Sequence, residues 1–248
     1  MKRCVCGGMV KNCPLCGGAG KPTCTVCLGT HYLSLKKLPD GDFGDVVYEV
    51  VPCPACLTKR GNEPVRPTGL REGMEDWTFE NMVQEHPALL EAAGQFRHIL
   101  ERRRGWGVLY CASGTGKSYL LASVANAAGG QGLQAHYVNT SFLLSQLQEA
   151  MMGKNDWTYT AMVRWLSDDV DVLCLNEFGD FNPTAWRTDT IKIILEHRSD
   201  PVWRPTFFAS NKPGRELAAM FPWLADRFNS SEVFESVLPG VPSLRGQE

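Results

Sequence analysis

The chain's 248 residues are enough for one ordinary domain plus a small one, and a hydrophobic content of 44% supplies a core. No apolar run approaches the length of a membrane-spanning helix, and the Cys-rich start is unlike a signal peptide. We therefore expect a soluble cytoplasmic protein with no membrane partner. The net charge of −2 combines +4 over residues 1–60 with −6 over the remainder. Charge therefore does not indicate a strong duplex-DNA binder, and any DNA contact must come from a local patch.

Eight of the ten cysteines lie in the first 56 residues and form four close pairs. In a chain with no export signal, such pairs indicate metal binding rather than disulfides. Two closely spaced sulfurs can face one metal from a tight turn, and two pairs complete a tetrahedral shell. Reduced cysteines in a small core fit less well, because little else in this region is apolar. The sequence predicts a cysteine-rich domain over residues 1–60 with two Zn²⁺, held by Cys4, Cys6, Cys13, Cys16, Cys24, Cys27, Cys53 and Cys56.

Residues 13–20 resemble the C-x-x-C-x-G-x-G repeat of the DnaJ-type zinc domain. The other pairs match that repeat less well, since the first pair is one residue short and the last lacks the glycines. The resemblance implies nested pairing, with the outer pairs on one zinc and the inner pairs on the other. His31 is then a bystander. Between the third and fourth pairs, residues 32–35 and 46–51 predict a β-hairpin around residues 39–42.

Residues 61–76 contain three glycines and two prolines and predict a linker. A helix is predicted next, over residues 87–104. Its end is basic, with Arg97 followed by Arg102, Arg103 and Arg104. Two interpretations stay open for these arginines: a solvated helix end favoured by the helix dipole, or a contact with nucleic acid or a partner.

A short apolar strand over residues 107–110 runs into a Gly-rich turn that ends in Lys-Ser, the order strand, phosphate-binding loop and helix. Backbone N–H groups would cradle a nucleotide's phosphates, Lys117 would reach the outer phosphates, and Ser118 would hold Mg²⁺. Cys111 stands where the usual first glycine belongs, which implies some strain. An ordinary Gly-rich turn is the alternative, but five matching residues in this context disfavour it. The predicted nucleotide-binding residues are Ser113, Gly114, Thr115, Gly116, Lys117 and Ser118.

The rest of the chain alternates strands and helices. Helices are predicted over residues 117–128, 140–152, 157–166 and 184–198, and strands over 134–139, 170–175 and 205–210. This spacing predicts an α/β fold, a parallel sheet covered by helices on both faces.

Residues 172–177 form an apolar strand that ends in Asn176 and Glu177. In P-loop ATPases an Asp at this strand end holds Mg²⁺ through water, and a following Glu activates the attacking water. Glu177 is present here, but Asn176 replaces the Asp and brings no negative charge. We expect weaker Mg²⁺ binding and slowed hydrolysis without loss of folding. An incidental polar strand end is the alternative.

Two more residues complete the predicted catalytic set. Asn211 ends the next strand, where an AAA+ ATPase places a polar residue to read the γ-phosphate; a polar turn before Pro213 is the alternative. Arg227 would lie at a subunit boundary as an arginine finger for a neighbour's nucleotide. A local pair with Asp226 is the alternative, and Arg198 and Arg204 are weaker candidates for the finger.

These motifs resemble those of the bacterial helicase-loader ATPases of the DnaC, DnaI and IstB type, over about two-thirds of the chain, from residue 77 to residue 245. The shared features are the Thr-Phe-Glu-Asn opening, the Gly-Thr-Gly-Lys-Ser loop, the Asn-Glu-Phe-Gly and Ala-Ser-Asn strand ends and the Ala-Asp-Arg-Phe box. The resemblance implies an AAA+ P-loop αβα domain over residues 77–248 with little or no helical lid, and ATPase activity. It also implies ATP-dependent homo-oligomers, contact with single-stranded DNA and a replicative DNA helicase as partner.

We therefore expect a zinc-bearing helicase loader whose cofactors are ATP, Mg²⁺ and two Zn²⁺. In this family the N-terminal segment commonly grips the helicase, and here the predicted zinc module takes that place. Two other functions stay open. One is a transposition accessory ATPase of the IstB type, which would act on duplex DNA. The other is a nucleotide-gated adaptor with little hydrolysis, which Cys111 and Asn176 favour.

Overall fold

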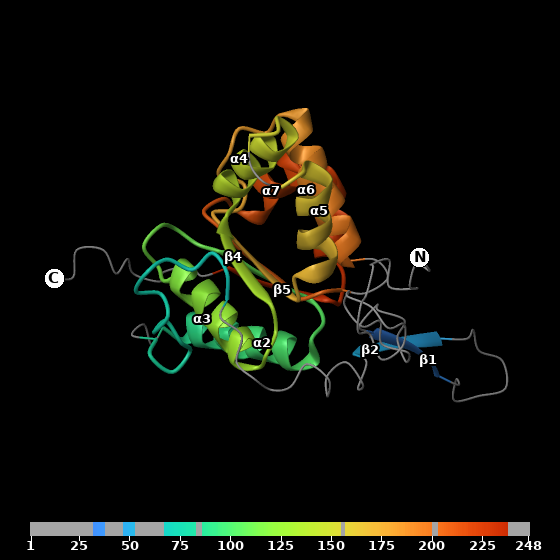
Figure 1. The fold of residues 1–248 in the computed structure, drawn as a ribbon. Helices are drawn as coiled ribbons and strands as arrows, with labels where there is room; N and C mark the ends of the chain where they lie inside the picture. Colours follow the sequence, from blue (N-terminus) through green and yellow to red (C-terminus); the bar gives the residue numbers. More distant parts are fainter. Residues whose placement is uncertain are drawn as a thin grey trace, which may run out of the picture. The chain divides into compact units, whose positions relative to one another are not determined.

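The computed structural model describes residues 67–82, 86–154, 157–199 and 203–237, together with two strands nearer the N-terminus (Figure 1). The chain divides into two compact units, Met1–Asn62 and Glu63–Glu248. In the first unit, β1 (Tyr32–Lys37) and β2 (Val47–Pro52) pair antiparallel, which confirms the predicted hairpin. All eight paired cysteines lie outside the described residues, so the two-zinc domain stays a prediction. None of the helices in the described ranges is long and apolar enough to cross a membrane.

The second unit is built on a five-stranded parallel sheet in the order β4-β5-β6-β3-β7. The order places β6 between β3, which precedes the phosphate-binding loop, and β5, which ends in the polar pair. Because all five strands run the same way, their carboxyl ends meet at one edge of the sheet, where ligands of such folds bind. The strands are β3 (Trp106–Tyr110), β4 (Ala135–Asn139), β5 (Val172–Asn176), β6 (Thr206–Ser210) and β7 (Val233–Val237).

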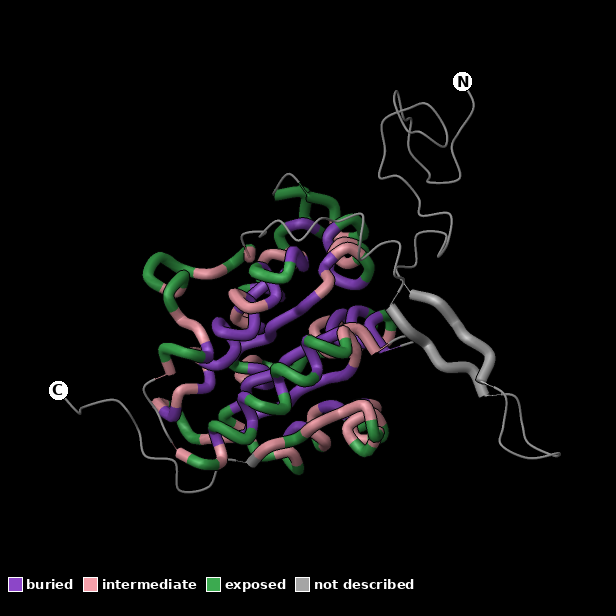
Figure 2. Tube along the Cα trace, turned by 90° about the horizontal axis from the view of Figure 1, so that it is seen from below, coloured by how far each residue is buried: buried purple, intermediate pink, exposed green. Residues whose placement is uncertain are grey.

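Helices cover both faces of this sheet, as predicted. Side chains alternate along each strand, so Leu109 and Cys174 pack against α2 (Pro87–Arg102) and α3 (Lys117–Gly130), whereas Val108 and Leu175 face the other layer. Figure 1 shows these two layers on opposite sides of β4 and β5, and Figure 2 shows the strands buried between them. The second layer contains α4 (Thr140–Met151), α5 (Tyr159–Arg164), α6 (Ala185–Ser199), α7 (Gly214–Met220) and α8 (Pro222–Phe228).

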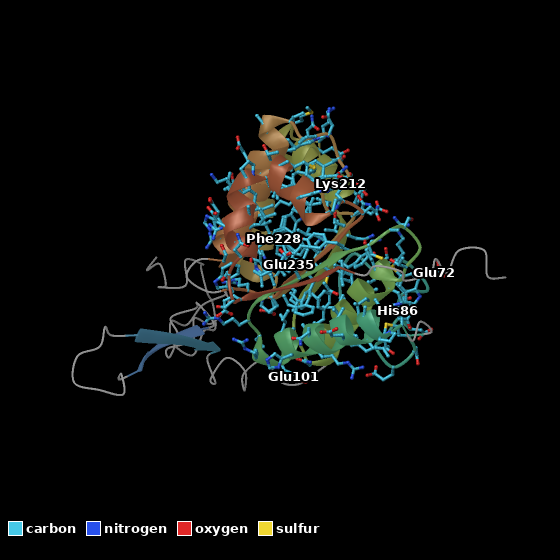
Figure 3. The ribbon with its side chains drawn as sticks, turned by 180° about the vertical axis from the view of Figure 1, so that it is seen from behind. Glu72, His86, Glu101, Lys212, Phe228 and Glu235 are labelled. Carbon is cyan, nitrogen blue, oxygen red and sulfur yellow. The ribbon has the colours of Figure 1, made fainter. Side chains whose placement is uncertain are left out.

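Capping residues explain where α2 begins and ends. His86, labelled in Figure 3, precedes the helix and accepts a hydrogen bond from the backbone N of Ala88 at 3.3 Å through Nδ1. Pro87 then fits the first helical position, where no backbone N–H is needed. Arg103 takes a left-handed φ of 53° at the C-cap, so the helix ends two residues before the predicted boundary at residue 104.

The helix predicted over residues 157–166 forms two shorter pieces. Thr158 caps α5 by accepting a hydrogen bond from the backbone N of Ala161 at 3.2 Å, so the helix begins at Tyr159. After Arg164 the chain widens into a π-helix, η1 (Trp165–Asp169). Because this turn occupies residues 165–169, β5 begins at Val172, two residues later in the sequence than the predicted start at residue 170.

The described part of the predicted linker packs onto the second unit. Thr68 forms a parallel bridge with β4: its N donates to the Ala135 carbonyl and its carbonyl accepts from the N of Tyr137, both at 2.9 Å. Gly69 has a φ of 82°, and a Cβ there would lie 1.9 Å from the Tyr137 carbonyl oxygen, so this close approach requires glycine. Asn126 of α3 donates to the carbonyls of Met74 and Trp77 at 2.8 and 2.9 Å. Residues 67–76 therefore belong to the second unit.

Candidate functional site

The loop between β3 and α3 has the geometry of an anion-binding turn. Gly114 and Gly116 have φ values of 85° and 91°, which a side chain would disfavour. Gly116 also precedes α3 without a side-chain cap, so the first N–H groups of this 14-residue helix have no capping acceptor. Those donors and the positive helix end favour phosphate. Cys111 has no positive φ, so the strain that we expected from its side chain at the first loop position is absent.

Lys117, the first residue of α3, points back into the loop. Its Nζ donates to the carbonyl oxygens of Cys111 and Ala112 at 2.7 and 2.5 Å, and the residue is only 7% exposed. Thr115 braces the same turn, because its hydroxyl donates to the Ala112 carbonyl at 3.0 Å. The ammonium group is thus held inside the loop, where it can exchange carbonyl oxygens for phosphate oxygens.

Ser118 and Asn176 bring two oxygen atoms together at this edge. The Ser118 hydroxyl donates to the Asn176 amide oxygen at 3.1 Å, although 58 residues separate them. Asn176 is 8% exposed, and its backbone carbonyl accepts from the Thr140 hydroxyl at 2.9 Å. Oxygen ligands suit Mg²⁺, which needs few from the protein because it keeps several waters. The pair therefore fits Mg²⁺ in chemistry, with one negative charge fewer than an Asp would give.

Glu177 follows Asn176 and is held in an unusual backbone conformation. Its φ is 53°, a left-handed value that is costly for a residue with a side chain. The next peptide fixes this turn, since the N of Phe178 donates to the Ala209 carbonyl at 2.8 Å. The exposed Glu177 carboxylate accepts a hydrogen bond from the Asn139 amide through Oε2. Strain that the surroundings maintain is typical of functional positions.

Asn139 is a site residue that the sequence analysis missed. It pairs with Asn176 in the sheet register, and its Oδ1 caps α4 by accepting from the N of Phe142 at 3.2 Å while its NH₂ donates to Glu177. The sequence did contain a signal for Asn139. It is a polar residue at the end of a buried strand, and the neighbouring strand ends in Asn176, a catalytic candidate.

Asn211 follows β6, so it lies between the strand that leads to the loop and the strand that leads to Glu177. Its amide Nδ2 donates to Oδ2 of Asp180 at 2.6 Å. The preceding Ser210 donates its hydroxyl to the Phe178 carbonyl at 2.8 Å. The end of β6 is therefore tied to the turn that carries Glu177.

Arg227 lies on α8, and the structure pairs it with a residue of α6. Its NH2 is 3.7 Å from Oε1 of Glu196, with 27% of the arginine side chain exposed. The local pair that we considered as an alternative thus forms, but with Glu196 instead of Asp226. Arg198 is fully buried, and its guanidinium donates to the Thr206 hydroxyl and to the carbonyls of Leu166, Val170, Asp171 and Pro205. Arg198 is therefore excluded as a finger.

The basic end of α2 is engaged in local contacts. Arg97 lies 4.7 Å over the Phe79 ring and 2.9 Å from the Glu80 carboxylate. Arg102 and Arg104 both reach Glu232, at 3.7 and 2.9 Å. The side chains of Arg97 and Arg102 nevertheless stay 47% and 49% exposed, so both interpretations of the arginine cluster stay open.

Within the described ranges, no group of three or more His, Cys, Asp or Glu side chains gathers that could hold a metal ion. The eight cysteines that we predict for zinc lie outside those ranges.

Comparison with known proteins places this site in a known fold. No protein-family model matches the sequence. The replicative helicase loader DnaI of Bacillus subtilis (strain 168) is 25% identical over 224 residues, which cover 86% of this chain and 68% of that protein. A crystal structure of DnaI matches 75% of this chain and 100% of its own, with a TM-score of 0.58 and 20% identity. The replication initiator DnaA, bound to AMPPCP and single-stranded DNA, matches 65% of this chain and 50% of its own, with a TM-score of 0.56 and 20% identity.

These similarities agree with the α/β fold predicted for the second unit and with the resemblance to helicase loaders. The α/β unit with its five-stranded parallel sheet is the part of this chain that resembles the matching structures in fold.

Proposed function

We propose that this chain is an ATP-dependent AAA+ helicase loader. It binds ATP with Mg²⁺, self-associates, contacts single-stranded DNA and delivers a replicative helicase through its N-terminal zinc module. One observation carries the proposal: Lys117, Ser118, Asn176 and Glu177 converge at the carboxyl edge of the sheet, in a chain similar to a helicase loader.

The loop residues bind and orient the phosphates. Lys117 neutralises the outer phosphates in place of the loop carbonyls that it now contacts, and the backbone N–H groups before and within the first turn of α3 hold the inner ones. Bound ATP with Mg²⁺ supplies the phosphoanhydride bond that is cleaved and the charge that polarises it. Ser118 and Asn176 are the residues that would hold the metal, directly or through its waters.

Glu177 acts as the base for the attacking water. Its Oε2 accepts the Asn139 amide, and the carboxylate keeps further lone pairs that can take the water's proton. Asn139 also keeps the carboxylate at a fixed angle to the sheet edge. Asn176 holds its oxygen in position but adds no charge, so hydrolysis is slow relative to an Asp-containing site.

The partners follow from the relatives. DnaI loads a replicative helicase, and the DnaA structure that shares this fold contains single-stranded DNA. We assign the same kinds of partner to this chain. A second function, a nucleotide-gated adaptor with little hydrolysis, is favoured specifically by Asn176, because binding geometry is kept while charge is lost.

The test is nucleotide and helicase binding by the full chain. Lys117→Ala removes the loop's only ammonium group and should abolish ATP binding with Mg²⁺, measured by calorimetry, while circular dichroism shows that the fold stays intact. Lys192→Ala is the matched control, since Lys192 is an exposed lysine of α6 that pairs with Glu196. ATP should also promote association with the replicative helicase of the same genome and with a single-stranded oligonucleotide. Unchanged ATP affinity in Lys117→Ala would misplace the site, and no helicase binding would refute the loader function.

A further inference from the structure

The turn that carries Glu177 is fastened to the end of β6 by three hydrogen bonds. Two of them fix the backbone of Phe178: its N donates to the Ala209 carbonyl and its carbonyl accepts the Ser210 hydroxyl, both at 2.8 Å. The third joins two side chains, Asn211 Nδ2 and Asp180 Oδ2, at 2.6 Å. It lies at the surface, beside Lys212, which Figure 3 labels. Because the two inner bonds already hold the turn, the exposed pair adds little to folding.

The chemistry of this pair determines how the Asn211 side chain presents itself. An amide can turn either its NH₂ or its oxygen toward a neighbour. An ionised carboxylate only accepts hydrogen bonds, so Asp180 selects the NH₂ and strengthens the bond through its charge. Asp180 follows β5 and the phosphate-binding loop follows β3, the two neighbours of the strand that Asn211 follows. The NH₂ group has two hydrogens, so its bond to Asp180 leaves the second one for a phosphate oxygen bound at the loop.

We propose that Asp180 is a positioning residue that orients the Asn211 amide toward the terminal phosphate of bound ATP. This inference rests on the proposed nucleotide function and adds to it a residue that distinguishes ATP from ADP. Ser141 supports the arrangement, because its hydroxyl donates to the Asp180 backbone carbonyl at 2.7 Å and fixes the residue relative to α4.

The two possible roles of Asp180, orienting Asn211 or repelling the phosphates by its charge, predict opposite effects of its removal on ATP binding, which makes the proposal testable. The Asp180 carboxylate has the same sign as the phosphates, so a purely electrostatic role would weaken the binding of ATP and ADP together. Orientation of Asn211 strengthens only the nucleotide that has a terminal phosphate. The informative quantity is therefore the ratio of the ADP and ATP dissociation constants, which a general effect on stability leaves unchanged.

The experiment measures the dissociation constants of ADP and of a non-hydrolysable ATP analogue, each with Mg²⁺, for the full chain. Asp180→Ala should reduce the preference for the ATP analogue about tenfold, the value of one oriented hydrogen bond to a charged group. Asp180→Asn can donate as well as accept, so it no longer selects the Asn211 NH₂ and should also lose most of the preference. Asn211→Ala should lose the preference as well, and adding Asp180→Ala to it should cause no further change.

Three results would overturn the proposal while leaving the nucleotide function intact. They are a wild-type ratio in Asp180→Ala, a wild-type ratio in Asn211→Ala, or an equal loss from Asp180→Ala in the presence and absence of Asn211. A wild-type chain that binds neither nucleotide would overturn the proposed function together with this inference. Melting temperatures of all variants should stay close to that of the wild type, as expected for an exposed pair.

Discussion

Protonation of a single buried histidine should make the stability of the second unit depend on pH. His136 lies on β4, is 9% exposed, and packs edge-on against Trp165 with ring centroids 4.8 Å apart. Its Nδ1 is 2.9 Å from the Thr68 hydroxyl, whereas its Nε2 is buried without a hydrogen-bond partner. Burial lowers the pKa of His136 from 6.5 to about 4, and a hydrogen bond that the ring makes to the Thr68 backbone opposes this only in part. Protonation would place a positive charge inside the protein and leave the Nε2–H without an acceptor.

The magnitude follows from the difference between the folded and unfolded pKa values. The unfolded chain binds a proton at His136 near pH 6.5, and the folded chain does so only near pH 4, so stability is full above the first value and falls as the pH drops toward the second. The loss is about 2 kcal/mol between pH 7 and pH 5, and it approaches about 3 kcal/mol near pH 4.

Urea denaturation from pH 7 to pH 4, followed by circular dichroism, measures this loss. Other groups titrate in the same range, so the comparison is with His136→Asn, whose amide can still bond Thr68 but does not ionise. The variant is less stable at every pH because it is smaller, yet its curve should be flatter by the stated amount. Parallel curves, or an NMR titration of His136 near pH 6.5 in the folded protein, would refute this reasoning.

Three other predictions concern the nucleotide and metal sites. Asn176→Asp should tighten Mg²⁺-dependent ATP binding and raise the hydrolysis rate, measured by phosphate release; an unchanged rate would show that the missing charge does not limit turnover. In that background, Arg227→Ala should lower hydrolysis by roughly 10³–10⁵, the value of an arginine finger, and mixing with Lys117→Ala chains should restore it. Glu196→Ala, which removes the observed partner of Arg227, is the control. Normal hydrolysis in Arg227→Ala would show that Arg227 is only the ion-pair partner of Glu196 and not an arginine finger. Metal analysis should find two Zn²⁺ per chain with the eight paired cysteines protected from thiol reagents, and zinc-free protein with titratable thiols would contradict the cysteine-rich domain.

The sequence predicted most of the parallel sheet and the loop because both depend on local patterns. Apolar strands buried on both faces, separated by long amphipathic helices, are visible over short windows. The region from Gly214 to Val237 was missed because α7 and α8 have only seven residues each, too few for a helical period, and because β7 is an edge strand with one neighbour. The division of residues 157–169 into α5 and η1 was also missed, since a π-turn has no distinct sequence pattern.

Only the residues that we expect to contact the nucleotide, Mg²⁺ or the attacking water could be predicted from the sequence. Lys117, Ser118 and Glu177 have residue types that their chemistry requires, so their roles could be inferred from motifs. Asn139 and Asp180 act through contacts with residues 38 and 31 positions away, at the ends of other strands. Such contacts depend on the order of strands in the sheet, which spacing along the chain does not give. The pair of Arg227 with Glu196 is another such contact, and the sequence offered only the neighbouring Asp226 as an alternative.

The contacts around Asn176 separate geometry from charge at this site. Three consecutive residues at the start of α4 hold the turn after β5: Asn139 binds the Glu177 carboxylate, Thr140 the Asn176 carbonyl and Ser141 the Asp180 carbonyl. Because these bonds fix the backbone from outside, the position of the Asn176 amide oxygen does not depend on a bound metal. An Asp side chain has the same shape and would place its oxygen in the same position. Asn176 therefore removes a charge from a site that stays assembled, which is why we expect weaker Mg²⁺ binding and slowed hydrolysis without loss of folding.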